Sequence, residues 1–139
     1  MKQKLCLLAG VILCILFVAP QVQAQKTAVL KSLSNFSVED TIINAGVKYQ
    51  SVASNAYAET AFIKATITKI SGTVACTVIA AGSFSTAGPW YPLDTLTATD
   101  VASQDKFLEI KNTKYFFYRV QYTGSGTMAA KLRSTLKAK

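Results

Sequence analysis

The sequence contains no histidine. This absence removes the most frequent general base and the most frequent transition-metal ligand, and it excludes the Ser-His-Asp and Cys-His arrangements of nucleophilic catalysis. Cysteine is also scarce, since the chain has only Cys6, Cys14 and Cys76. Two of these lie within the first 24 residues, and the single Cys76 that remains is too few for a thiolate zinc site. The sequence therefore predicts a protein that is not an enzyme and that carries no metal and no cofactor.

Acidic residues are few as well. The seven carboxylates are scattered apart from the adjacent Glu39 and Asp40, and no Asp-x-Asp spacing is typical of a calcium site. Paired carboxylates for glycoside hydrolysis are not evident. The stretch Gly124-Ser125-Gly126-Thr127 resembles a phosphate loop in composition, but it joins two expected strands and opens no helix.

The first 24 residues have the pattern of a secretory signal peptide. Lys2 and Lys4 precede an apolar run, Leu5 to Ala19, and Val22-Gln23-Ala24 supplies a small-x-small cleavage site. The apolar run is shorter than the roughly 20 residues that cross a bilayer, which favours cleavage over a retained anchor. We expect residues 25–139 to be secreted or displayed at the cell surface, with the periplasm as the alternative. Membrane attachment would require an uncleaved leader.

Cleavage would leave Cys76 as the single thiol, so no disulfide can form within the mature chain although export would permit one. Cys76 alternates with Val74 and Val78, which predicts a buried apolar side chain. The sequence has no linker rich in Pro, Gly or Ser and no internal repeat. We therefore expect residues 25–139 to form one domain that depends on packing alone.

Positive charge is concentrated towards the C-terminus. Without Lys2 and Lys4 the chain keeps 13 basic residues against 7 acidic ones, and from Lys106 onward eight basic residues stand against Glu109 alone. Such asymmetry is typical of a face that binds polyanions. Solvated lysines that discourage aggregation of edge strands are the alternative explanation. Export argues against nucleic acid as the natural ligand.

Along the exported part, apolar residues recur with the period of two that is typical of β-strands, and no stretch has helical spacing. Ser71-Gly72-Thr73 and Gly124-Ser125-Gly126 are expected to be hairpin turns. Residues 115–123 are apolar on both faces, which predicts a central strand. The expected strands are residues 27–33, 46–51, 61–70, 74–81, 93–98, 106–110, 115–123 and 127–134.

Seven or eight short strands joined by Gly, Ser and Asn turns favour an all-β fold, a single antiparallel β-sandwich of immunoglobulin-like or jelly-roll type. A small β-barrel is the alternative. The Cys-Trp-Cys pattern of true immunoglobulin domains is absent.

Aromatic side chains supply the positive indications of binding. Trp90 and Tyr91 lie between two prolines in an expected loop, where they could form a flat platform on which a sugar ring stacks. The alternative is that Trp90 closes one end of the sandwich core. The candidate contact residues are Trp90, Tyr91, Tyr115, Phe117, Arg119, Lys131, Arg133 and Lys137.

The order of several short motifs resembles a known group of modules. Gly72, Trp90, Tyr118-Arg119-Val120 and Gly124-Ser125-Gly126 follow one another as they do in small β-sandwich modules of tailed-bacteriophage virions. The resemblance covers residues 61–132 and rests on turns and core positions. It implies a structural or adhesive surface module and transfers no site residue. The leader departs from that family, because virion proteins assemble in the cytoplasm.

Three hypotheses follow. The first is a non-enzymatic exported sandwich that acts by assembly or adhesion, by pairing with itself or with another surface protein through Tyr115, Phe117 and the basic strands. The second is a carbohydrate- or polyanion-binding module that uses Trp90 and Tyr91, or Lys131, Arg133 and Lys137. The third is a decoration or fibre component of a phage virion.

Overall fold

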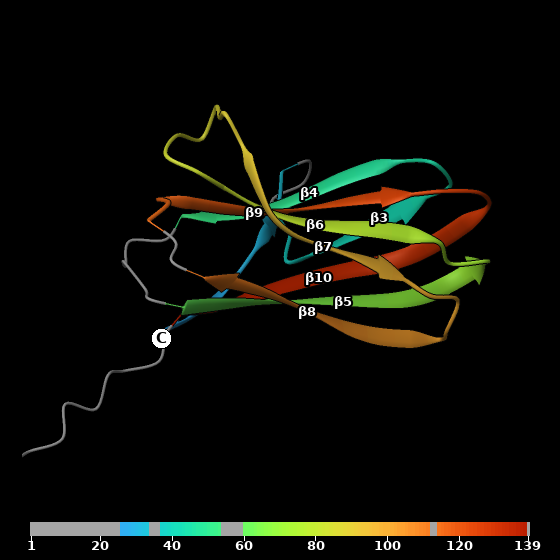
Figure 1. Ribbon diagram of the computed structural model, residues 1–139. Coiled ribbons are helices and arrows are strands. Elements are labelled where there is room, and N and C mark those ends of the chain that lie inside the picture. Colours follow the sequence, from blue (N-terminus) through green and yellow to red (C-terminus); the bar gives the residue numbers. More distant parts are fainter. Residues whose placement is uncertain (1–25, 34–36, 54–59, 112–113, 139) are drawn as a thin grey trace, which may run out of the picture.

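The computed structural model describes residues 26–33, 37–53, 60–111 and 114–138. In these ranges the chain forms two antiparallel sheets that pack face to face as a β-sandwich (Figure 1). The predicted leader, residues 1–24, lies outside the described residues. The ranges described contain no helix long and apolar enough to cross a membrane.

In the part of the chain that the structure describes, each sheet has five strands. In sheet A, β10 pairs with β5, β5 pairs with β8, and the other edge of β10 pairs with both β1 and β3. The strands of sheet A are β1 (Lys26–Val29), β3 (Glu39–Ile43), β5 (Thr60–Gly72), β8 (Ser103–Lys111) and β10 (Met128–Ala138). Those of sheet B, in spatial order, are β2 (Lys31–Ser32), β4 (Val47–Ala53), β9 (Phe117–Gly124), β6 (Cys76–Ser83) and β7 (Tyr91–Ala98).

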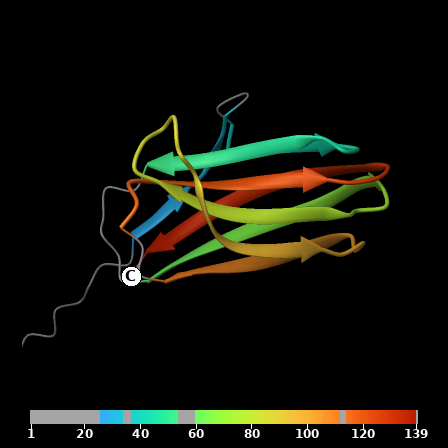
Figure 2. The ribbon, with the colours of Figure 1, turned by 45° about the horizontal axis from the view of Figure 1, so that its top comes forward.

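The sandwich prediction is confirmed, and the described residues form ten strands where seven or eight were expected. One extra strand arises because the expected strand 27–33 is divided at the buried Leu30, where the chain passes from β1 in sheet A to β2 in sheet B. The other is β3, which was missed because Glu39–Ile43 begins with two acidic residues. Within the described residues no strand pairing joins the two sheets, so the barrel alternative is wrong. Figure 2 shows the two layers with their strands along the long axis.

The core lies between the sheets and is built by alternation. Tyr118, Val120 and Tyr122 of β9 point inward and are almost fully buried, as are the apolar residues expected on the inner faces of β5, β8 and β10. The prediction of a central strand is also confirmed, because β9 lies between β4 and β6.

The two predicted hairpins are wrong. β5 and β6 lie in different sheets, and so do β9 and β10, so the turns at Gly72 and at Gly124-Ser125-Gly126 carry the chain from one layer to the other. The backbone N–H of Thr73 donates to the carbonyl of Thr127 at 3.0 Å, which ties the two crossings together. The physical reason is that alternation only shows which face of a strand is apolar. Two successive strands can bury these faces either as neighbours in one sheet or from opposite sheets across the core.

A buried polar network joins the sheets. Gln50 of β4 is fully buried; its Nε2 donates to the carbonyl of Leu132 at 3.2 Å, and its Oε1 accepts from Ser134 Oγ at 2.8 Å. Ser134 Oγ and Tyr122 Oη share a further hydrogen bond of 2.6 Å. Because buried polar groups are costly unless paired, this network fixes how β4 faces β10.

Cys76 is buried in β6, as expected, and has no disulfide partner among the described residues. Burial raises the pKa of its thiol to about 11. We therefore expect a thiol-specific reagent at about pH 8 to label the native protein slowly and the protein unfolded in denaturant quickly, because the thiolate is the reactive form. Labelling measured by mass spectrometry checks this, and fast native labelling would contradict it.

Candidate functional site

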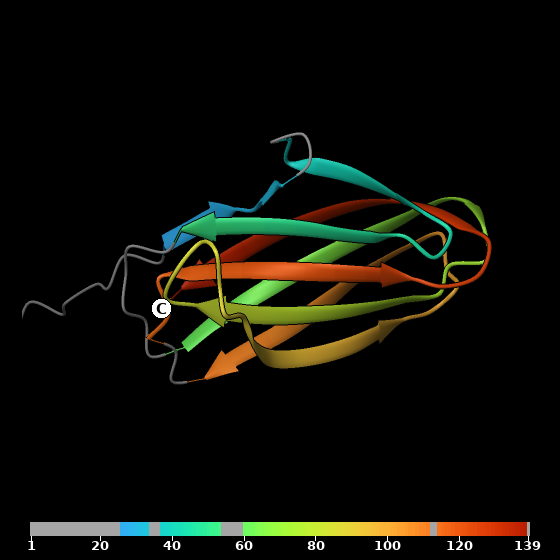
Figure 3. The ribbon, with the colours of Figure 1, turned by 90° about the horizontal axis from the view of Figure 1, so that it is seen from above.

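Trp90 lies outside the core, over the outer face of sheet B. The loop between β6 and β7 crosses in front of β9 (yellow, Figure 3) and places the indole over Arg119. The Arg119 Cζ atom lies 4.4 Å from the centre of the Trp90 ring and 4.8 Å from the centre of the Tyr49 ring. The guanidinium is thus in contact with both aromatic rings.

The strand register explains why the indole fits here. Arg119 stands opposite Ser51 on β4 and Ala81 on β6, two small residues that leave space above the sheet. Tyr49 lies on the same outer face two residues before Ser51. On the loop side, Gly88 has a φ of +94°, and a Cβ atom there would lie 3.0 Å from Trp90 Cδ1. Glycine therefore permits the close approach of loop and ring.

Arg119 is half-buried. Burial lowers the pKa of its guanidinium, and the charge interaction with Tyr49 opposes this effect. The Nε atom is buried and has no hydrogen-bond partner among the described residues. The Trp90 and Tyr49 rings lie against the guanidinium and offset part of the cost of burying its charge.

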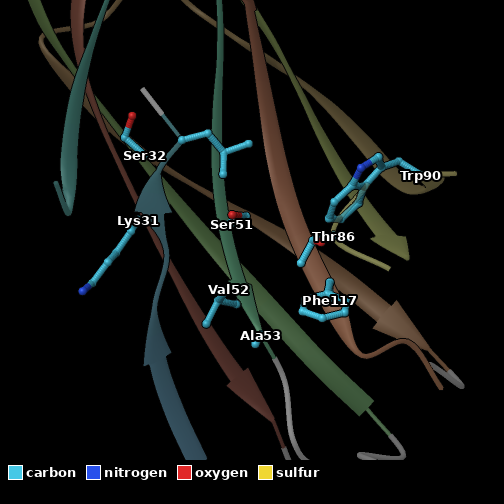
Figure 4. Close-up of a pocket in the computed structure, with 9 residues that line it drawn as sticks. Lys31, Ser32, Ser51, Val52, Ala53, Thr86, Trp90 and Phe117 are labelled. Carbon is cyan, nitrogen blue, oxygen red and sulfur yellow. The ribbon is translucent and has the colours of Figure 1, made fainter. Parts of the chain in front are cut away.

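A pocket of about 290 Å³ lies beside this stack (Figure 4). Trp90, Thr86 and Phe117 form one side, and the middle of the floor is β4. The side chain of Lys31 points away from Trp90. The lining residues are Lys31, Ser32, Leu33, Ser51, Val52, Ala53, Thr86, Trp90 and Phe117.

The chemistry of this pocket suits binding. Two aromatic rings and several aliphatic side chains give apolar walls, while the hydroxyls of Ser51 and Thr86 can donate or accept hydrogen bonds. Among the described residues, no carboxylate lines this pocket. In the described part of the chain, no group of three His, Cys, Asp or Glu residues could hold a metal ion.

The structure does not combine Trp90 and Tyr91 in one platform. The Tyr91 ring stacks on that of Tyr115, with centres 5.8 Å apart and planes at 22°. The ring centre of Tyr115 also lies 6.5 Å from that of Tyr118, edge to face, and 5.0 Å from that of Phe84. The reason is that consecutive residues of an extended chain point to opposite sides. Trp90 does not close the end of the core either, because it covers the outside of sheet B.

The eight predicted contact residues thus fall in three places. Trp90, Phe117 and Arg119 come together on the outer face of sheet B. Tyr91 and Tyr115 belong to an aromatic cluster beside the start of β7. Lys131, Arg133 and Lys137 point outward from β10, on sheet A. Sequence reasoning missed Tyr49, since only the pairing of β4 with β9 brings it to Arg119.

No family model matches the sequence, and no curated protein matches it either. Solved structures do match. A family 4 carbohydrate-binding module has a TM-score of 0.53 at 10% identity and covers 87% of this chain and 83% of its own. A family 28 module described as specific for non-crystalline cellulose has a TM-score of 0.51 at 8% identity, covering 85% and 87%. A family 36 domain of a multidomain xylanase from the hindgut metagenome of Trinervitermes trinervoides has 0.53 at 8% identity, covering 83% and 97%.

At such low identities these matches establish the fold. The chain is a β-sandwich module of the architecture that these binding modules share. They give no support to a module specific to tailed phages. The part of the predicted resemblance that stands is therefore the sandwich itself.

Proposed function

We propose that the protein is an exported, non-enzymatic module that binds polysaccharide at the pocket beside Trp90. The observation that carries the proposal is the half-buried indole of Trp90, which lies outside the core against Arg119 and forms one wall of a pocket of about 290 Å³. The fold shared with carbohydrate-binding modules supports it.

The pocket suits a sugar ring for two reasons. One face of a pyranose carries mainly C–H groups, which pack against the flat rings of Trp90 and Phe117. The rim of the sugar carries hydroxyls, for which Ser51 and Thr86 are partners. Arg119 acts as a positioning residue, because it fixes the indole before the ligand arrives and so lowers the entropic cost of binding.

The test is a pair of matched variants. Trp90→Ala should weaken binding of soluble hydroxyethylcellulose or xylan by about 30-fold, because a central aromatic contact is typically worth about 2 kcal/mol. Tyr91→Ala, which removes the neighbouring ring from the Tyr115 cluster, should leave affinity within about twofold. Affinity electrophoresis measures both. In the unmodified protein, Trp90 is the single tryptophan, so its fluorescence should shift on binding.

The opposite pattern would reject this site. Equal binding by the Trp90→Ala variant, with a circular dichroism spectrum like that of the parent, would mean that the pocket does not hold the polysaccharide. Failure of the unmodified protein to retain any polymer of the panel would reject the function itself.

Assembly or adhesion is the second candidate function. The exposed rings of Phe84 and Tyr91, which pack on Tyr115, favour it as a contact surface, whereas Phe117 lies in the pocket. A defined oligomer in light scattering that persists at high salt would support this candidate.

A further inference from the structure

A second hollow lies on the outer face of sheet A, away from the Trp90 pocket. It has a volume of about 630 Å³. Four different strands each contribute one hydroxyl side chain to its lining: Thr27 of β1, Thr66 of β5, Ser103 of β8 and Thr135 of β10. These hydroxyls can both donate and accept hydrogen bonds, so the hollow is suited to a ligand rich in hydroxyl groups.

The remaining lining side chains are charged, and the acidic one is already engaged. Asp105 Oδ1 accepts from Thr66 Oγ1 at 2.7 Å, and Asp105 Oδ2 forms an ion pair with Lys64 Nζ at 2.9 Å. The other two charged groups are Arg133 and Lys137, and neither has an ion pair among the described residues. The hollow therefore has an excess of two positive charges.

The cations lie in a row along one strand. Lys131, Arg133 and Lys137 all project from the outer face of β10, where residues two apart are spaced by about 7 Å. On β5 and β8, Phe62 and Phe107 share this outer face and are 44% and 62% exposed. Phe62 is directly opposite Lys137 in the strand register, and Phe107 is opposite Lys64. Exposed rings thus flank the charged hollow.

We infer that this hollow binds an acidic polysaccharide, a chain whose sugar residues carry carboxylates. The hydroxyl lining matches the hydroxyls of the sugars, Arg133 and Lys137 match the carboxylates, and the exposed phenyl rings offer surfaces to the sugar rings. This site differs from the Trp90 pocket in sheet, charge and lining residues. The inference therefore does not depend on the proposed function.

The test uses the purified protein and polygalacturonic acid as the probe. The double variant Arg133→Gln/Lys137→Gln should lose about tenfold or more in affinity, measured by isothermal titration calorimetry at low salt. A matched double variant, Lys111→Gln/Lys114→Gln, removes the same charge from exposed positions outside the lining and should stay within about twofold of the parent. Raising the salt to about 0.5 M should weaken binding of the parent.

Several outcomes would overturn the inference. Equal losses in the two double variants would show that diffuse charge, and not the hollow, attracts the polymer. Equally tight binding of neutral dextran would exclude recognition of carboxylates. Tighter binding of duplex DNA, or of vesicles containing phosphatidylglycerol, lost in the Arg133→Gln/Lys137→Gln variant, would assign the hollow to a different anionic partner.

Discussion

Replacing Gly72 with alanine should destabilise the protein by about 3 kcal/mol or more, which is a large part of the stability of a small domain. Gly72 has a φ of +70°, in the left-handed region that is costly for a residue with a Cβ atom. A Cβ atom at this position would also meet the carbonyl oxygen of Thr127, which belongs to the adjoining crossing between the sheets. Because that neighbour is backbone, it cannot move without displacing the start of β10.

Gly126 provides the matched control. It also has a φ of +70°, but a Cβ atom there would have no heavy atom within 4 Å. Gly126→Ala should therefore cost only the conformational penalty, about 1 kcal/mol. Urea unfolding followed by circular dichroism measures both variants. Similar losses in the two would show that the close approach of Gly72 to Thr127 does not hold in solution.

Replacing Gln50 with alanine should cost about 3 kcal/mol, since the change leaves a cavity and removes three side-chain hydrogen bonds, including a weaker one to the carbonyl of Val38. The Leu132 carbonyl loses the Gln50 donor and Ser134 Oγ loses the Gln50 acceptor, in a place that water does not reach. The effect should appear as a lower denaturation midpoint with an unchanged slope.

Gln121 is the control for this second prediction. It has the same side chain, lies on the half-buried outer face of β9, and donates to Thr123 Oγ1 at 3.2 Å. Gln121→Ala should change stability by about 0.5 kcal/mol at most. If both glutamine variants lost the same stability, the buried network would not be a main source of cohesion between the sheets.

Much of the fold could be predicted because alternation is a local property. In β5 and β10, for example, the inward positions Ile63 and Leu132 are visible from their neighbours in the sequence. Sheet membership is not local. Nothing near Gly72 indicates whether the next strand pairs with β5 or faces it across the core, so both expected hairpins were in fact crossings between layers.

The candidate site was predictable in part for the same reason. Trp90 and Arg119 drew attention by residue type, but their contact depends on how the loop after β6 folds back over β9. Tyr49 gave no separate signal, because its partners are set by the register between β4 and β9. The hollow on sheet A collects residues from four strands, which no sequence spacing brings together.

The placement of the two hollows on opposite outer faces has a mechanical consequence. Two polymers bound to one copy would be separated by both sheets, whose packing distance is about 10 Å. A short sugar chain cannot reach around the domain to occupy both sites at once. Binding at one face therefore does not raise the effective ligand concentration at the other. With both proposed ligands bound, the protein would cross-link a neutral polysaccharide to an acidic one. The stiffness of a gel that contains both polymers would rise with added protein until the binding sites on the polymers are filled, and would then fall.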